Sequence, residues 1–175
     1  MSVNAHRELW GFPPWLVIAT GILLAAKSYF AMSLDLFGDG AWYWLEATNL
    51  AFAYSDLPPA TALSIRAGVA LLGDNPFGVR FWFLLIGVLP PLITYRWARE
   101  LGSPWAAGWA AAVALSIPMI ATLGVLALPD VLLITVGLAA CCAFERATRS
   151  EQLGLTPWLV TGLLVGAGFV VHYRF

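Results

Sequence analysis

The sequence predicts an all-α integral membrane protein, a polytopic helix bundle of about five spans with a long first outer loop that carries interfacial helices. Three observations lead to this class. Of the 175 residues, 61% are hydrophobic and only 11% are charged, whereas a soluble domain carries roughly 25% charged residues to keep its surface hydrated. Apolar runs recur that reach the roughly 20 residues needed to cross a bilayer. Nine Trp, ten Phe and five Tyr residues are enough for aromatic belts at both interfaces.

The first predicted span lies near residues 14–34, which are apolar except for Lys27 and begin at a Pro-Pro pair. No small-residue cleavage site ends this run, so we interpret it as a span or signal anchor rather than a cleaved signal peptide. Residues 35–76 regain charges and turn formers and are expected to form a long loop. Inside the loop, residues 41–54 are rich in aromatic side chains and residues 60–72 have an apolar face. Both segments are expected to be short interfacial helices.

The second span is predicted near residues 77–95. It contains the pair Pro90-Pro91, which must kink the helix because neither proline can donate the helical hydrogen bond. Residues 96–104 then form a short polar hairpin.

Two further spans are predicted within residues 105–144, where Asp130 is the only charged residue. This run is too long for one helix, so we divide it into spans near 105–123 and 128–146, with the turn just before Asp130. A polar loop follows, and a fifth span is expected near 158–175. All five spans would belong to one transmembrane domain that covers residues 1–175.

Arginine placement predicts the orientation of the bundle. If the spans alternate in direction, the N-terminal segment, the hairpin 96–104 and the loop 145–157 share one side of the membrane. That side carries Arg7, Arg96, Arg99, Arg146 and Arg149. The positive-inside rule then places the N-terminus in the cytoplasm. The carboxylates of the long loop and Asp130 are therefore expected on the outer face.

Candidate chemistry lies in these outer segments. Asp39 stands between two glycines just after the first span, where a ligand can approach it closely. Asp130 follows a proline and is both a candidate site residue and a natural helix N-cap. Asp56 precedes two prolines and either fixes a turn or takes part in function. Lys27 lies near the middle of the first span, where a charge usually points into the bundle; it could pair with an acidic group or snorkel.

The order of these motifs resembles the start of the GT-C membrane glycosyltransferases. Aromatic residues follow Asp39, a Tyr-x-Asp-x-Pro-Pro segment begins at Tyr54, and a Gly-Asp turn covers residues 73–80. A Pro-Asp pair then precedes the fourth span, and a Gly-rich span ends in His172-Tyr173. Within this family the chain is most similar to the protein O-mannosyltransferases and the bacterial aminoarabinose-to-lipid A transferases, from about residue 12 onward.

This resemblance implies an enzyme that moves a sugar from a polyprenyl-phosphate-linked donor to a lipid, glycan or protein acceptor, at the outer face of a bacterial inner membrane. By position, Asp39 and Asp130 match the family's acidic residues, with Asp39 as the base or the group that orients the acceptor. The other implied site residues bind substrate: Tyr54, Asp56, Arg66, His172, Tyr173 and Arg174. Gly40 replaces a second acidic residue that is common in the family, which weakens a metal site. Metal ligands are therefore unknown, no cofactor is certain, and a divalent cation stays an option.

Other interpretations stay open. Tyr54 could be an interface anchor, and Arg80 could touch a phosphate or anchor the interface. A transporter would place ionisable groups and broken helices near the bilayer midplane, and Lys27 and the Pro-Pro kink are such features. A non-catalytic assembly subunit would keep the topology without needing Asp39. The net charge of −1 excludes the basic face of a nucleic-acid partner. The apolar run reaches Phe175 with no closing loop, so we expect the N-terminal part of a longer protein, which could be inactive alone.

Overall fold

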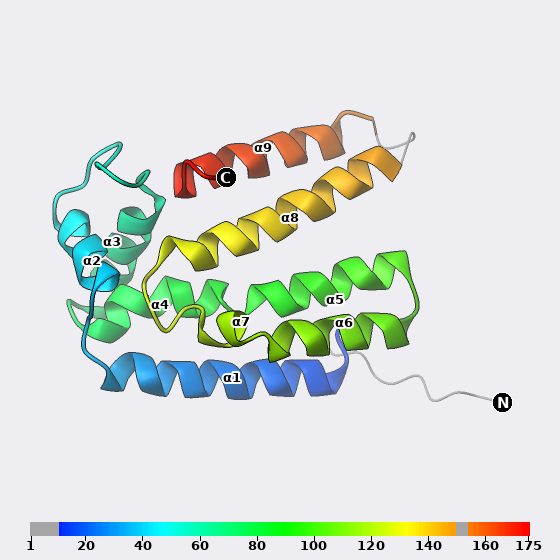
Figure 1. Ribbon diagram of the computed structural model, residues 1–175, viewed down its shortest axis with the longest axis horizontal. Coiled ribbons are helices and arrows are strands. Elements are labelled where there is room, and N and C mark those ends of the chain that lie inside the picture. The colour runs from blue at the N-terminus through cyan, green and yellow to red at the C-terminus, as the bar shows by residue number, and fades with distance from the viewer. Residues whose placement is uncertain (1–10, 150–153) are drawn as a thin grey trace.

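The computed structural model describes residues 11–149 and 154–175, which form helices and connecting loops (Figure 1). No strand occurs within these two ranges, so the predicted all-α class is confirmed. The helices in order are α1 (Pro14–Ser33), α2 (Asp39–Thr48), α3 (Ala60–Leu72), α4 (Pro76–Ile86), α5 (Leu89–Leu101), α6 (Pro104–Ser116), α7 (Pro118–Thr122), α8 (Pro129–Arg149) and α9 (Thr156–Val171).

Three helical stretches are long and apolar enough to cross a membrane. They are Pro14–Ser33, Pro76–Leu101 and Pro129–Arg149, with 20, 26 and 21 residues. Ala60–Leu72 and Thr156–Val171 are shorter apolar helices. This composition is that of an integral membrane protein, and the division into five spans stays a prediction.

The stretch Pro76–Leu101 is interrupted at Gly87 and Val88, where α4 ends and α5 begins. Pro90 and Pro91 therefore lie in the first turn of a new helix, where the missing N–H groups would have no helical partner in any case. Another segment passes close to this interruption. A Cβ atom at Gly87 would lie 2.8 Å from the carbonyl oxygen of Leu123, so the close approach requires a glycine there.

The predicted span 105–123 is not one continuous helix. It consists of α6, the five-residue α7 and a turn that leads into α8. The Lys27 ammonium of α1 donates hydrogen bonds to the carbonyl oxygens of Ile120, at 3.0 Å, and Leu123, at 2.7 Å. Carbonyl groups freed by a helix break at membrane depth must find donors within the protein. Lys27 is only 2% exposed. Within residues 11–149 and 154–175 it therefore binds free backbone carbonyl groups rather than an acidic side chain, and it does not snorkel.

Arg80 holds the end of α1. Its guanidinium donates to the carbonyl oxygens of Ala31, Leu34 and Asp35 at 2.8, 2.6 and 2.8 Å. A cation at a helix C-terminus satisfies free carbonyl groups and matches the helix dipole. Arg80 is 2% exposed, so both alternatives considered for it, a phosphate contact and an interface anchor, are wrong.

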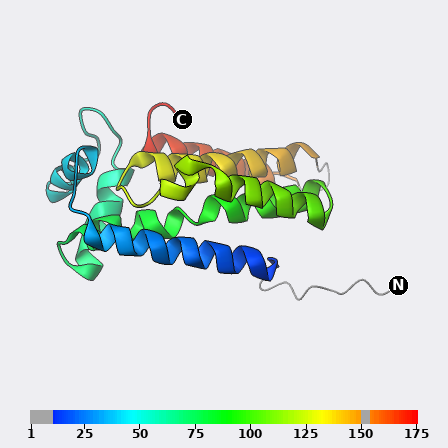
Figure 2. The same cartoon turned by 60° about the horizontal axis from the view of Figure 1, so that its bottom comes forward.

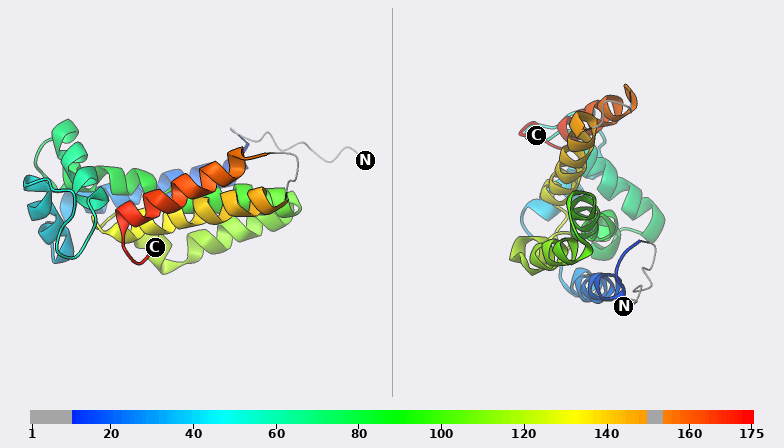
Figure 3. Two further views of the ribbon diagram at one scale, coloured as in Figure 1. Left: turned by 90° about the horizontal axis from the view of Figure 1, so that it is seen from above. Right: turned by 90° about the vertical axis from the view of Figure 1, so that its right-hand side faces the viewer.

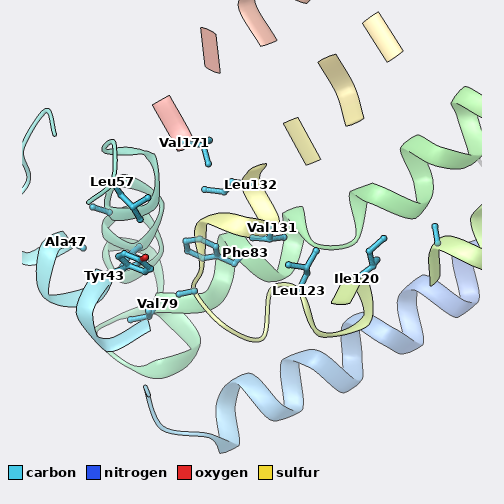
Figure 4. Packing of buried hydrophobic residues seen from close by; sticks show 14 residues of the cluster. Tyr43, Ala47, Leu57, Val79, Phe83, Ile120, Leu123, Val131, Leu132 and Val171 are labelled. Carbon is cyan, nitrogen blue, oxygen red and sulfur yellow. The ribbon is translucent and has the colours of Figure 1, made fainter. Parts of the chain in front are cut away.

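The long helices run beside one another, whereas α2 and α3 lie across one end of the bundle (Figures 1 and 2). The N-terminus of α8 and the last residues of the chain lie toward the same end, and the α5–α6 connection and the end of α8 lie at the other (Figure 3). A buried cluster joins the α2–α3 end to the bundle, with Tyr43, Leu57, Phe83 and Val131 among its members (Figure 4).

Candidate functional site

A cavity of about 320 Å³ opens at the α2–α3 end of the bundle. It lies between α2, the loop that follows α2, the first turns of α8 and the segment after α9. Its lining joins carboxylates, two phenols, basic groups and apolar side chains: Tyr43, Asp56, Leu57, Pro129, Asp130, Leu133, His172, Tyr173 and Arg174. Small-molecule sites are usually mainly apolar with a few polar groups, whereas six of these nine lining residues carry polar side chains. A hollow of about 370 Å³ at Trp15, Trp105 and Trp109 has an apolar lining instead.

The cavity brings together residues that are far apart in the sequence. Asp56, Asp130, His172, Tyr173 and Arg174 were all singled out from the sequence, and all line it. The other three candidates, Asp39, Tyr54 and Arg66, are not among its lining residues.

Asp39 is exposed and is the first residue of α2, so it belongs to a helix rather than to the loop. Gly38 before it has a φ of 53°, a left-handed conformation that favours glycine. The first glycine of the Gly-Asp-Gly motif thus turns the chain into α2. The Asp39 carboxylate then lies at the positive end of the helix dipole, where a negative charge is stabilised.

Asp130 is half-buried in the first turn of α8, which begins at Pro129. It is therefore not the N-cap residue, because the proline before it already opens the helix. Its charge still matches the helix dipole. Asp130 also lines a second, smaller cavity of about 220 Å³, whose walls include Met119, Leu123 and Leu128.

Tyr54 folds the loop after α2 back onto that helix. Its hydroxyl lies 3.1 Å from the carbonyl oxygen of Glu46 and 3.2 Å from that of Asn49, and it accepts a hydrogen bond from the N–H of Ala51 at 3.1 Å. The Tyr54 N–H donates to the carbonyl oxygen of Leu57. Asp56 lies in the chain between Tyr54 and Leu57, so these contacts position it at the cavity wall.

Glu46, which the sequence analysis missed, does not line the cavity but acts on Asp56, which does. The pKa of the Glu46 carboxyl is raised, first by burial and then by the neighbouring Asp56, whereas the Trp42 side chain lowers it. A carboxyl group close to another carboxylate keeps its proton to a higher pH than an isolated one.

Tyr43 was missed as well. Burial is the largest cause that raises the pKa of its phenol, to about 12, and four carboxylates add to the effect: Asp39, Asp56, Glu46 and Asp130. The charge of Asp39 therefore acts at the cavity although its side chain does not line it. Asp39, Tyr43 and Glu46 are spaced by four and three residues, which puts them on one face of a helix. This spacing is the feature of the sequence from which Tyr43 and Glu46 could have been predicted to act together with Asp39.

The basic groups of the cavity come from the segment after α9. The N–H of Arg174 donates to Nδ1 of His172 at 3.0 Å. The rings of His172 and Tyr173 lie 4.6 Å apart, and the Arg174 guanidinium lies 5.8 Å from the centre of the Tyr173 ring. These contacts hold a compact turn. Arg66 lies elsewhere, on α3, beside Trp44 and Asp74.

No group of three or more His, Cys, Asp or Glu side chains in residues 11–149 and 154–175 could hold a metal ion. The acidic residues at the cavity therefore do not fit a metal centre formed by this part of the chain, and no metal ligand is assigned to them.

Comparison with known proteins gives two matches. Residues 56–175 match the family described as dolichyl-phosphate-mannose-protein mannosyltransferase. Over 143 residues the chain is 33% identical to the lipid A galacturonosyltransferase RgtD of Rhizobium johnstonii, an alignment that covers 79% of this chain and 29% of that protein. The chain thus spans less than a third of the length of this relative. No solved structure matches significantly.

Proposed function

Because the chain belongs to the dolichyl-phosphate-mannose-protein mannosyltransferase family, we propose that it forms part of a GT-C glycosyltransferase that acts at the outer face of the membrane. The proposed reaction transfers a sugar from a polyprenyl-phosphate-linked donor to an acceptor. The observation that carries this proposal is the cavity that combines Asp56 and Asp130 with His172 and Arg174.

The two kinds of side chain suit the two ends of the reaction. The acceptor hydroxyl loses its proton to a carboxylate while its oxygen bonds to the anomeric carbon, and the bond from that carbon to the phosphate oxygen breaks. A positioned base and a cation near the departing phosphate both lower the barrier to such a step. We propose Asp39 as the base that meets the incoming acceptor, Asp130 as the carboxylate that orients the sugar, and Arg174 with His172 as the phosphate site.

The acceptor class follows from the relative. The protein from Rhizobium is named for lipid A and galacturonic acid, so we propose a glycolipid acceptor, in a bacterial inner membrane. The long helices would anchor the site close to both lipids, since the α2–α3 end carries the cavity and the apolar helices extend from it (Figure 1).

One observation no longer supports the transporter alternative. Lys27 was a candidate for a coupling group within the membrane, but its ammonium is bound to the carbonyl oxygens of Ile120 and Leu123. The ionisable residues that line the cavity lie at one end of the bundle rather than near its middle. This arrangement favours chemistry at a membrane face.

The test uses the full-length protein in proteoliposomes, with a panel of labelled polyprenyl-phosphate-linked sugars and a glycolipid acceptor. Asp39→Asn should reduce transfer by about 10²–10⁴-fold, the usual contribution of a general base, while donor binding stays near normal. Asp130→Asn should reduce transfer less. Full transfer by a well-expressed Asp39→Asn protein would contradict the assignment of Asp39 and favour a transporter or assembly role.

Donor binding is measured separately with Arg174→Ala. Loss of a charge-assisted hydrogen bond to phosphate should weaken binding about tenfold to a hundredfold. Arg99→Ala is the matched control, because Arg99 is an exposed arginine in the last turn of α5, away from the cavity. Equal binding by the two variants would show that the phosphate is not held at Arg174.

A further inference from the structure

The cavity contains one more residue that is suited to hold the donor. We propose that the Tyr43 hydroxyl donates a hydrogen bond to a hydroxyl group of the sugar on the lipid-linked donor. This inference rests on the proposed function and adds a sugar-binding contact to it.

The packing of Tyr43 fixes the position of its hydroxyl. The residue is 9% exposed, and its ring belongs to the buried cluster with Leu57, Val79 and Phe83 (Figure 4). It also lines the cavity. A ring held by its neighbours can present a hydroxyl to a ligand at low entropic cost, because few rotamers remain to be lost on binding.

The hydroxyl is available to a ligand. Within residues 11–149 and 154–175, no hydrogen-bond partner of the Tyr43 hydroxyl is found. The Tyr43 hydroxyl is not one of the buried polar atoms that lack a partner, so it is open to solvent at the cavity. The Tyr54 hydroxyl, by contrast, has three backbone groups within reach. A ligand in the cavity can therefore take the place of solvent at Tyr43.

The surrounding charges determine which role the hydroxyl can take. The carboxylates of Asp39, Glu46, Asp56 and Asp130 all oppose formation of a phenolate. Near neutral pH the phenol therefore keeps its proton, so it acts as a donor and not as a base. A bound group that accepts a hydrogen bond from the Tyr43 hydroxyl and donates one to a neighbouring carboxylate would pair with both kinds of side chain.

A sugar hydroxyl meets that requirement, because one hydroxyl group both donates and accepts. A phosphate only accepts and would be repelled by the acidic wall formed by Asp56 and Asp130, whereas it fits Arg174 and His172 in the same cavity. A hydrocarbon chain would leave the polar groups unpaired. The lining thus divides into a wall for a polyhydroxylated ring and a wall for phosphate.

The experiment compares Tyr43→Phe with the unmodified full-length protein in detergent, using two probes. One is a polyprenyl-phosphate-linked sugar that the unmodified protein transfers, and the other is the polyprenyl phosphate without sugar. Tyr43→Phe should bind the sugar-bearing lipid about threefold to tenfold more weakly, as expected for one neutral hydrogen bond, and should bind the sugar-free lipid normally. Tyr29→Phe is the matched control, because Tyr29 is 65% exposed on α1 and does not line the cavity.

The outcomes separate this contact from the function on which it rests. Normal binding of both probes by Tyr43→Phe would overturn the contact, and so would equal weakening of both, which would indicate a structural role. The normal binding of the sugar-free lipid also shows that the variant is folded. If the unmodified protein neither binds nor transfers any lipid-linked sugar, the proposed function fails and the contact fails with it.

Discussion

Glu46 of α2 and Asp56 of the loop that follows it bring two interacting carboxyl groups together. Burial and the neighbouring charge raise the pKa of Glu46 above its ordinary value of 4.5. A carboxyl group whose pKa is raised on folding stabilises the folded state most fully below its unfolded pKa. That contribution is lost as the pH rises through the raised, folded pKa.

Glu46→Gln should therefore flatten the dependence of stability on pH, because the amide of glutamine does not titrate. In the unmodified full-length protein, the contribution of this link to the thermal midpoint should fall as the pH rises from 4.5 through the folded pKa of Glu46. Thermal unfolding in detergent across that interval measures the difference between the two proteins. Asp74→Asn is the control, because the side chain at position 74 can accept the hydrogen bond from the Trp44 indole both as aspartate and as asparagine. Parallel pH curves for Glu46→Gln and the unmodified protein would contradict the raised pKa of Glu46.

At the scale of single residues, the sequence predicted the cavity residues that belong to recognisable motifs, such as Asp56, Asp130 and His172. Tyr43 and Glu46 escaped because the helix was predicted to begin at residue 41, whereas α2 begins at Asp39. With Asp39 placed in a loop, the common helical face of these three residues could not be seen. Their meeting with α8 and the C-terminal turn depends on tertiary packing, which no local pattern encodes.

The position of α3 depends on a close approach to α4. A Cβ atom at Gly68 would lie 2.1 Å from the carbonyl oxygen of Gly78, and one at Gly78 would lie 2.3 Å from that of Gly73. Both obstacles are backbone atoms, which cannot turn away as a side chain could. Because neither glycine has a Cβ atom, α3 and the adjacent loop can pack closely against α4.

Gly68→Ala should destabilise the protein by about 1–3 kcal/mol, the usual cost of overpacking. The lowered thermal midpoint of the full-length variant in detergent measures it. Gly21→Ala is the matched control, since Gly21 is also helical but has nothing within 4 Å of its added Cβ, and it should be neutral or slightly stabilising. Equal effects of the two substitutions would show that the α3–α4 contact is not as close as described.

At the scale of elements, the length of the apolar runs predicted the positions of the long helices well. The first predicted span, 14–34, ends one residue after α1, and the predicted helix 60–72 has the bounds of α3. Breaks inside apolar runs were harder to predict. The separate α7 is stabilised by a group distant in sequence, the Lys27 ammonium, which donates to the carbonyl oxygens of Ile120 and Leu123. The apolar run predicts one continuous span over residues 105–123, because a local pattern contains no information about a partner so distant in the sequence.

On the scale of the whole molecule, the ends of the bundle differ in chemistry. The cavity lies at the α2–α3 end. At the other end, Arg146 of α8 forms an ion pair with Glu100 of α5 and donates from Nε to its carboxylate at 2.8 Å, and Arg149 donates to the Glu100 carbonyl. The arginine-rich segments that the positive-inside rule assigns to the cytoplasm lie at this second end where the structure describes them.

The proposed function requires the cavity to open on the outer face of the membrane, opposite the α5–α6 connection. Single cysteines at Ser55, beside Asp56, and at Ser103 test it most directly in the full-length protein after replacement of Cys141 and Cys142. Both serines are exposed, and a permeant thiol reagent should label both cysteines. In intact cells, an impermeant reagent should label the cysteine at Ser55 and not the one at Ser103. Labelling of both positions from outside, or of Ser103 alone, would contradict the account.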